Sequence, residues 1–266
     1  MRGRVRLFSI VAILTVVLVV SAVFASGVVT PSKFTLNTMN IVQPNNPGPT
    51  VFVDPGSTIK DYINNPGYQI GNTFYVNINV TEMVDLFTWQ LNLTWNPAVL
   101  NFTKRVTYGD FLYRTTSPDK TSRTVTISGG DNVTGNGWAA ETILGNYAGI
   151  SGAGRLASLQ FQVVGYGSSN LVIGTSGTMP TMLLNSAGVN IAFVTINGYF
   201  RNALTGDVNF DKIVNIQDIV SVKYHWYPGP PVGAGGYGRD FDVNDDAAIN
   251  IQDIVLVKAN WGRSTP

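Results

Sequence analysis

Two runs of oxygen-bearing side chains near the end of the chain share one spacing. The first run spans residues 207–218 and the second spans 242–253, an offset of 242 − 207 = 35 residues. In each run Asp or Asn occupies positions 1, 3, 5, 9 and 12. Calcium prefers about six to eight oxygen ligands, and a short loop that turns alternate residues inward and closes on a carboxylate supplies them. Each run therefore has the ligand order of an EF-hand calcium loop.

The spacing predicts two calcium sites. Position 7 of each loop contributes its backbone carbonyl, so the predicted ligands are Asp207, Asn209, Asp211, Ile213, Asn215 and Asp218 in the first loop and Asp242, Asn244, Asp246, Ala248, Asn250 and Asp253 in the second. Position 6, where EF-hand loops prefer Gly for a sharp turn, holds Lys212 and Ala247. A left-handed backbone at a residue with a side chain costs about 1 kcal/mol, so we expect weaker sites than in a glycine-containing loop. The closing Asp is also shorter than the Glu that gives bidentate closure.

A short helix is predicted after each loop. Apolar residues recur there with a helical period: Ile216, Ile219, Val220 and Trp226 in the first copy, and Ile251, Ile254, Val255 and Trp261 in the second. The segments before the loops, 201–206 and 236–241, are too short and too rich in turn formers for a helix. Each unit is therefore one loop and one helix, and we expect Val214 and Ile249, at position 8, to pair the two loops.

This doubled unit resembles a dockerin, the calcium-folded module by which cellulosome-type proteins dock onto cohesins. The resemblance rests on the repeated loop and helix, the Asn at position 9, the Asp at position 12 and the connecting segment 227–239. It implies that positions 10 and 11 and two positions further down each helix contact the partner: Ile216, Gln217, Lys223 and Tyr224, and Ile251, Gln252, Lys258 and Ala259. The best-known dockerins carry Ser or Thr where this chain has the Ile-Gln pair. For Ile216 and Ile251, packing in an amphipathic helix core is an equally good interpretation.

Composition excludes several functional classes. The 266 residues are enough for about two domains. The net charge of +1 and the lack of a basic stripe argue against a nucleic-acid partner. Eight of the 14 Asp residues lie between Asp207 and Asp253, so acidity is concentrated in the predicted calcium module. Cysteine is absent, which excludes disulfides and thiolate metal sites.

The amino-terminal segment indicates export. Three Arg residues precede an apolar run at residues 7–20, and the small residues that follow favour cleavage after Ala25, so residues 1–25 are predicted to be a signal peptide. Residues 7–24 are also nearly long enough to span a bilayer, which leaves an uncleaved membrane anchor as the alternative. Both interpretations place the protein outside the cytoplasm, secreted or tethered to the cell surface. Possible glycan acceptors in Asn-X-Ser/Thr sequons are Asn79, Asn92, Asn101 and Asn132.

A polar, Pro- and Asn-containing linker is predicted for residues 26–49, followed by a β-rich domain at 50–201. Segments rich in Val, Ile, Phe, Tyr, Trp and Thr predict strands at 73–81, 86–95, 100–107, 123–128, 156–164, 171–174 and 191–200, with weaker candidates at 51–53 and 142–144. Turn clusters such as 96–97, 129–131 and 165–168 separate them. About nine short strands without helical periodicity indicate an antiparallel jelly-roll β-sandwich. The fold class is mainly β, with a small α-helical calcium module at 202–266.

The predicted sandwich resembles a cohesin. Residues 86–100 are similar to a strand, turn and following Leu of that family, and residues 152–163 are similar to its Gly-rich turn into a central strand. The resemblance implies that one face of a sheet binds dockerins.

Other kinds of functional site have weaker support in the sequence. Residues 152–157 fit a dinucleotide fingerprint but lead into a strand rather than a helix. The lone His225 has no metal-ligand partners in the sequence pattern. A glycosidase needs two facing carboxylates, and the predicted sandwich offers Glu82, Glu141 and scattered Asp. Four aromatic residues are candidates for stacking on sugars, although aromatic residues of a sandwich more often belong to its core. They are Trp89, Tyr108, Tyr113 and Trp138.

These observations predict an extracellular, non-catalytic assembly or adaptor protein. Its expected partners are cohesin- or dockerin-bearing proteins, including further copies of itself, in a polysaccharide-degrading complex. If its own two modules match, the contact produces head-to-tail chains or closes within one molecule. The alternatives are a carbohydrate-binding module that a dockerin attaches to a scaffold, and a surface-layer or adhesion protein. An enzyme is the least supported class.

Overall fold

The computed structural model describes residues 48–112, 124–176, 179–227 and 237–266, which belong to one compact unit. The predicted signal peptide or anchor, and all of the predicted linker except its last two residues, lie outside the described residues. No helix in the described part of the chain is long and apolar enough to cross a membrane.

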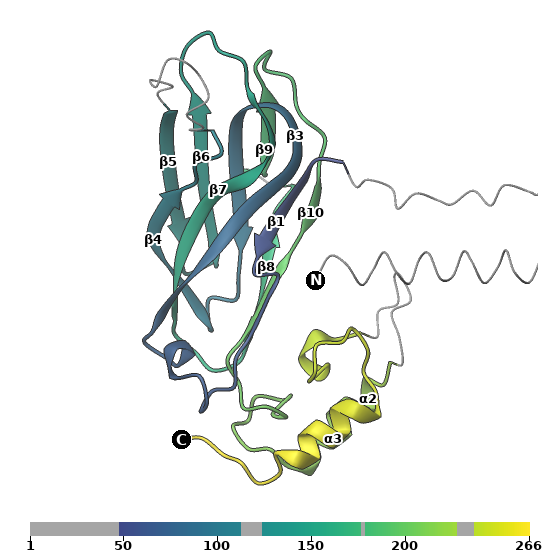
Figure 1. The fold of residues 1–266 in the computed structure, drawn as a ribbon. Helices are drawn as coiled ribbons and strands as arrows, with labels where there is room; N and C mark the ends of the chain where they lie inside the picture. The colour runs from purple at the N-terminus through teal and green to yellow at the C-terminus, as the bar shows by residue number, and fades with distance from the viewer. Residues whose placement is uncertain (1–47, 113–123, 177–178, 228–236) are drawn as a thin grey trace, which may run out of the picture. The chain divides into compact units, whose positions relative to one another are not determined.

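The β-rich domain, hereafter the sandwich, holds all the strands (Figure 1). They are β1 (Thr50–Asp54), β2 (Ser57–Ile59), β3 (Thr73–Thr94), β4 (Leu100–Tyr108), β5 (Thr124–Asp131), β6 (Asn136–Ile143), β7 (Ile150–Val163), β8 (Ser168–Ile173), β9 (Met182–Asn185), β10 (Val194–Ile196) and β11 (Gly198–Arg201). A 3-10 turn, η2, spans Pro66–Tyr68. Pairing is antiparallel except for the parallel pairs β1 with β10 and β2 with β11. The predicted jelly-roll sandwich is confirmed.

Strand β3 organises the sandwich. Its first half pairs with β1 and β7, and its second half pairs with β6 and β9 before its last residues reach β8. Two irregularities bend it, at Glu82 and Asp85, whose φ angles are 57° and 56°. Sequence reasoning predicted two strands here because this polar, charged segment interrupts the alternation, but the chain continues through it as one bent strand.

The sandwich core follows from period-two alternation. Along the first half of β3, Phe74, Val76, Ile78 and Val80 are buried while their neighbours face outward. Aromatic rings fill the centre, where Phe74 stacks on Phe200 of β11 with ring centroids 4.8 Å apart. Burial of each side chain of this size stabilises the folded state by about 1.5–3 kcal/mol. The core therefore holds in place the strands that lead into the calcium module.

Two predicted turns were wrong, and two short strands were missed. Residues 129–131, predicted to be a turn, are the end of β5. The predicted Gly-rich turn at residues 152–154 lies inside β7, where Gly152 and Gly154 pair with the irregular part of β3. Strands β2 and β9 were not predicted, because three and four residues are too few to show a period.

The module at residues 202–266, hereafter the calcium module, contains α2 (Ile216–Tyr224), a 3-10 turn η3 (Arg239–Phe241) and α3 (Ile251–Ala259). The two helices pack against each other (Figure 1). Both begin with the same cap, in which an Asn accepts a backbone N–H of the first turn and the third helical residue, an Asp, accepts the N–H of that Asn. The predicted helices are confirmed, and in the described residues the turn η3 is the only helical segment that lies immediately before either loop.

Candidate calcium-binding module

Each loop turns through two left-handed residues. At position 6, Lys212 and Ala247 have φ angles of 72° and 67°, as the EF-hand pattern predicts for the site of its usual Gly. At position 4, Phe210 and Asp245 have φ angles of 61° and 57°, which sequence reasoning did not anticipate. The repeated geometry shows that the two copies share one backbone path despite different residues at these positions.

The Asp at position 12 closes each loop. Asp218 accepts the N–H of Val208 on Oδ1 at 2.9 Å and the N–H of Asn215 on Oδ2 at 2.8 Å. In the second loop Asp253 accepts the equivalent N–H groups, from Val243 at 2.7 Å and Asn250 at 2.8 Å. One carboxylate thus ties the start of the loop to the start of the helix.

Burial of the carboxylates is the strongest indication of a cation. Four Asp side chains, at positions 1 and 12 of the loops, are 0% exposed: Asp207, Asp218, Asp242 and Asp253. The ion pairs between described residues, Arg239 with Asp245 and Arg263 with Asp61, include none of them. Buried carboxylates are normally paired or bound to a metal. Asp207 Oδ1 is also buried without a hydrogen-bond partner, so this oxygen is available for a cation.

The pKa shifts agree with this environment. Burial raises the pKa of the Asp207, Asp218 and Asp242 carboxyls above the ordinary value, and the surrounding loop carboxylates raise it further. Hydrogen bonds to these carboxylates offset part of that increase. A divalent cation would relieve both the desolvation and the mutual repulsion. The donor set therefore fits calcium.

Local hydrogen bonds orient the remaining predicted side-chain ligands within each loop. Within the first loop, Asn209 Oδ1 accepts the N–H of Asp211 at 3.0 Å, and Asp211 Oδ1 accepts the N–H of Ile213 at 2.9 Å. The Asn at position 9 instead caps its helix: Asn215 Oδ1 accepts the N–H of Gln217 at 2.7 Å, and Asn250 repeats this bond. The described residues contain no group of three or more His, Cys, Asp or Glu side chains drawn together around one point. The assignment of the two loops as calcium sites therefore rests on the order of the oxygen donors in the sequence and on the buried carboxylates.

The two loops do not pair through their position-8 residues, as the sequence had led us to expect. Val214 exchanges backbone hydrogen bonds with the segment after α3, and Ile249 exchanges them with Tyr227, after α2. Each loop is thus joined to the segment that follows the helix of the other copy. The side chains of Val214 and Ile249 are 0% exposed and belong to one small core. The repeat is one folding unit rather than two independent halves.

The predicted partner-contacting residues lie at the surface. Ile216 is 57% exposed and Ile251 is 58% exposed, which decides against core packing for both. The six other predicted partner residues are exposed as well: Gln217, Lys223, Tyr224, Gln252, Lys258 and Ala259. Between them, Val220 and Val255 are also exposed apolar residues. Each helix therefore presents an apolar strip to solvent, which folding alone does not explain.

The sandwich contacts the calcium module through polar residues that sequence reasoning missed. Tyr166, between β7 and β8, donates its hydroxyl to Asp207 Oδ2 at 2.5 Å. Arg201 at the end of β11 is 2% exposed and donates to the carbonyl oxygen of Asp207 at 2.8 Å. Asp61 accepts from Thr205 and Arg263. The contacts of Tyr166 and Asp61 join residues 41 to 202 positions apart, so no local spacing could have revealed them.

Three of the other candidates for catalysis or sugar binding lie together in the sandwich. Trp89 is buried and donates to Glu141 at 3.1 Å, while Tyr108 packs beside it, so these residues form core rather than a sugar platform. Burial raises the pKa of Glu141, and its hydrogen bonds come from Thr124 and Trp89 rather than from a second carboxyl. Glu82 is exposed at the bend of β3. Tyr113 lies outside the described residues.

His225 is packed. Its ring stacks on Phe241 with centroids 3.5 Å apart, and Nδ1 lies 2.9 Å from the carbonyl oxygen of Ser221. The side chain therefore joins the end of α2 to η3.

The four predicted glycan acceptors differ in how their amides are bound. Asn79 donates to Asp54 at 3.1 Å, and Asn132 both donates to and accepts from the backbone of Phe102. Asn92 is 7% exposed and exchanges amide hydrogen bonds with Asn136. Asn101 is half-buried in β4. A glycan on Asn92 would have to displace the Asn136 contact.

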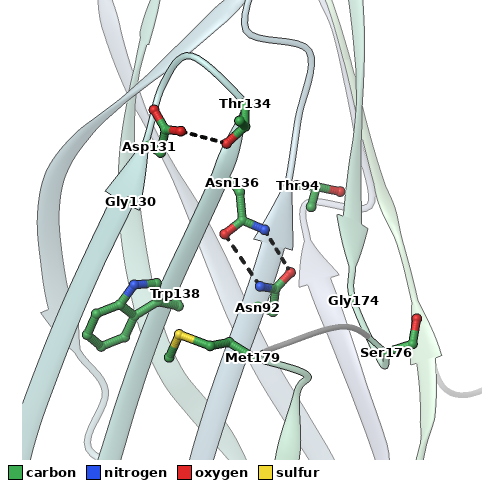
Figure 2. Close-up of a pocket in the computed structure, with 10 residues that line it drawn as sticks. All are labelled: Asn92, Thr94, Gly130, Asp131, Thr134, Asn136, Trp138, Gly174, Ser176 and Met179. Atoms are coloured by element: carbon green, nitrogen blue, oxygen red, sulfur yellow. Dashed lines mark hydrogen bonds between the residues drawn. The ribbon is translucent and has the colours of Figure 1, made fainter.

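Asn92 also lies in a polar groove of the sandwich with a volume of about 770 Å³ (Figure 2). The groove lies along the ends of β3, β5 and β6 and beside the segment after β8, and its lining residues are Asn92, Thr94, Gly130, Asp131, Thr134, Asn136, Trp138, Gly174, Ser176 and Met179. One half-buried aromatic ring among amides, hydroxyls and a carboxylate is a surface that a saccharide can occupy.

Comparison with known proteins identifies a family for residues 205–261. The family model of the dockerin type I domain matches residues 205–261. No curated protein matches the chain. Among solved structures, the chain is similar to a non-cellulosomal cohesin from the archaeon Archaeoglobus fulgidus, with 20% identity, a TM-score of 0.42, and coverage of 61% of this chain and 96% of the other.

Two further solved structures come from Acetivibrio cellulolyticus. The second type II cohesin module of the adaptor ScaA scaffoldin is 18% identical over 59% of this chain and 96% of that one, with a TM-score of 0.45. The third cohesin of ScaC, solved in complex with the ScaB dockerin, is 13% identical over 58% of this chain and 99% of that one, also with a TM-score of 0.45.

The match to residues 205–261 covers both loops and both helices. It agrees with the repeated loop geometry, the buried carboxylates and the paired caps. The calcium module of this chain is therefore a dockerin type I module.

Proposed function

We propose that this chain is an extracellular, non-catalytic assembly protein whose dockerin module binds two calcium ions and docks onto a cohesin-bearing partner. The sandwich, on this proposal, receives a dockerin-bearing partner. The observation that carries the proposal is the pair of apolar strips, around Ile216 and Val220 on α2 and around Ile251 and Val255 on α3, held next to loops with buried carboxylates. A docking surface explains both features at once, because calcium would fix the helices whose outer faces meet the partner.

Calcium, when bound, supplies the positive charge that lets the loop carboxylates stay ionised while buried. The residues of the chain do the rest. Asp218 and Asp253 hold loop and helix together, Asn215 and Asn250 start the helices, and the shared core around Val214 fixes the two helices against each other. The proposed ligands are the 12 residues that the sequence predicts.

The docking proposal is tested by calorimetric titration of the full chain against a panel of purified cohesins, in calcium and in EGTA. Val220→Asp and Val255→Asp place a charge in each exposed strip without touching a loop ligand. Binding in calcium that is lost in EGTA and weakened by these substitutions supports docking. Failure of every cohesin to bind in calcium, or binding that neither EGTA nor the substitutions alter, contradicts it. Sedimentation of the full chain alone shows whether its own modules match, because matched modules would form larger assemblies in calcium.

A saccharide-binding sandwich is the second candidate, favoured by the groove beside Trp138 and Asn92. Aromatic stacking and amide hydrogen bonds are the usual means of holding a sugar ring. Titration of the full chain with cello-, xylo- and manno-oligosaccharides, followed through the indole signal of Trp138, tests this function. Trp138→Ala should abolish binding, and unchanged spectra at millimolar oligosaccharide would exclude it.

A further inference from the structure

The first calcium loop receives a hydrogen bond from outside its own module. Tyr166 lies in the sandwich, in the turn between β7 and β8. Its hydroxyl donates to Asp207 Oδ2 at 2.5 Å and accepts the backbone N–H of Leu204 at 2.8 Å. Asp207 is position 1 of the loop, and its other oxygen, Oδ1, is buried without a protein partner. The hydroxyl therefore fixes one carboxylate oxygen and leaves the other free.

The second loop receives the same bond from within the module. Tyr237, just before η3, donates its hydroxyl to Asp242 Oδ2 at 2.6 Å. In both loops the same Oδ2 also accepts the N–H of position 6, from Lys212 at 2.9 Å and from Ala247 at 2.8 Å. A phenol hydroxyl can donate one hydrogen bond, and each tyrosine donates it to position 1 of a loop. The two sites differ in where this donor comes from.

The sandwich also holds the segment that leads into the first loop. Arg201 donates to the carbonyl oxygen of Asp207, and Asp61 accepts from the backbone and the hydroxyl of Thr205. Two sandwich rings, Tyr62 and Tyr166, pack edge to face at 5.2 Å and lie against the core of the calcium module. Position 1 of the first loop therefore receives side-chain contacts directly from the sandwich. The sandwich also holds the segment before the second loop, where Tyr199 donates to Asp240 at 2.5 Å, but the hydrogen bond to position 1 of that loop comes from Tyr237.

We propose that Tyr166 is a positioning residue for the first calcium loop, so that calcium occupancy of this loop and folding of the sandwich stabilise each other. Donors that orient a metal-binding carboxylate affect affinity although they never touch the ion. Coupling between two such equilibria is reciprocal, so a sandwich that favours calcium binding is itself stabilised by calcium. In the second loop the donor to position 1 is Tyr237, which belongs to the module, so no sandwich side chain positions that carboxylate directly. The inference rests on the calcium binding proposed above.

The test compares Tyr166→Phe with Tyr237→Phe in the full chain. Calcium is titrated while the amide signals of Lys212 and Ala247 are followed by NMR, because each N–H bonds position 1 of its own loop. Tyr166→Phe should weaken the first loop by about tenfold and leave the second unchanged, and Tyr237→Phe should do the opposite. Hydrogen exchange at the buried Phe200 of β11 reports sandwich stability. The calcium-induced slowing of that exchange should shrink in Tyr166→Phe by a similar factor.

Tyr166→Phe also removes the acceptor of the Leu204 N–H, so it loosens the junction as well as freeing the Asp207 carboxylate. Asp61→Asn is the second variant that separates these two effects. It loosens the same junction without touching a loop ligand, and it should weaken the first loop less than Tyr166→Phe does. Equal losses in Asp61→Asn and Tyr166→Phe would show general loosening and overturn the positioning role. Wild-type affinity in Tyr166→Phe, with both loops still binding calcium, would overturn the inference while leaving the proposed function intact. No response of either amide in the wild type would overturn both.

Discussion

Arg263, which follows α3, donates from both guanidinium nitrogens to the carboxylate of Asp61 in the sandwich, with Nη1 to Oδ2 and Nη2 to Oδ1 each 2.8 Å. Asp61 also accepts the backbone N–H and the hydroxyl of Thr205, both at 2.9 Å. One carboxylate therefore binds both the first and the last segments of the dockerin module. The dockerin module is therefore not independent of the sandwich that precedes it, because the two share polar contacts.

Replacing this carboxylate should destabilise the protein. Asp61→Asn removes the charge that a bidentate arginine requires, and we expect a loss of about 1–3 kcal/mol in the free energy of unfolding, measured by urea denaturation. Asp245→Asn is the matched control, because Arg239 and Asp245 form the second ion pair among the described residues and are about one-third exposed, at 31% and 29%. An exposed pair contributes about 0–1 kcal/mol. Equal effects of the two substitutions would contradict the special role of Asp61.

The Asp61 contribution should depend on pH in a defined direction. Burial alone would raise the pKa of Asp61, but the hydrogen bonds from Arg263, Thr205 and Asn64 outweigh burial and hold it well below the ordinary 3.8. A lowered pKa in the folded state means that the stabilisation is complete above pH 3.8 and is lost as pH falls further.

The pH test measures the stability difference between wild type and Asp61→Asn. It should be constant from pH 7 to about pH 5 and decrease below about pH 4. The loop carboxylates titrate in both proteins, so the difference isolates Asp61. A difference that grows on acidification would contradict this assignment.

The left-handed residue at position 6 should limit loop stability. Ala247 has a φ angle of 67°, which costs a residue with a side chain about 1 kcal/mol. Ala247→Gly removes that strain and should raise both calcium affinity and thermal stability by a corresponding amount, measured by calorimetry. Lys223→Gly, in the last turn of α2, is the contrasting change, because glycine lowers helix stability by up to about 1 kcal/mol. If Ala247→Gly were as damaging as Lys223→Gly, the backbone strain would not be limiting.

The exposed apolar strips should matter for docking but little for folding. Val220→Asp and Val255→Asp change side chains that are 59% and 56% exposed. Surface substitutions away from special features alter stability by about 0.5 kcal/mol or less. Val222→Asp is the contrast, because Val222 is 0% exposed in the module core and its substitution should unfold the module. Unfolding by Val220→Asp, seen as lost helical circular dichroism, would show that the strip belongs to the core.

The two repeated loops were predictable because the Asp and Asn residues that define them, such as those from Asp207 to Asp218, are local in the chain; their role as calcium ligands stays a prediction. The strands with clear alternation, such as the first half of β3, were predictable for the same reason. What sequence reasoning missed depends on distant partners. Tyr166 looked like one residue of a Gly-rich turn, and only the folded chain brings it to Asp207. The exposure of Ile216 was equally undecidable, since an amphipathic period does not say which apolar residues remain uncovered.

The central claim is that two calcium ions fold and organise the dockerin module. The most direct measurement is calcium stoichiometry of the full chain by calorimetry after exhaustive EGTA treatment, with Asp218→Ala and Asp253→Ala measured in parallel. We predict two ions for wild type and one for each variant, with helical circular dichroism that rises on calcium addition. Wild type that binds no calcium, or variants that still bind two ions, would contradict the account.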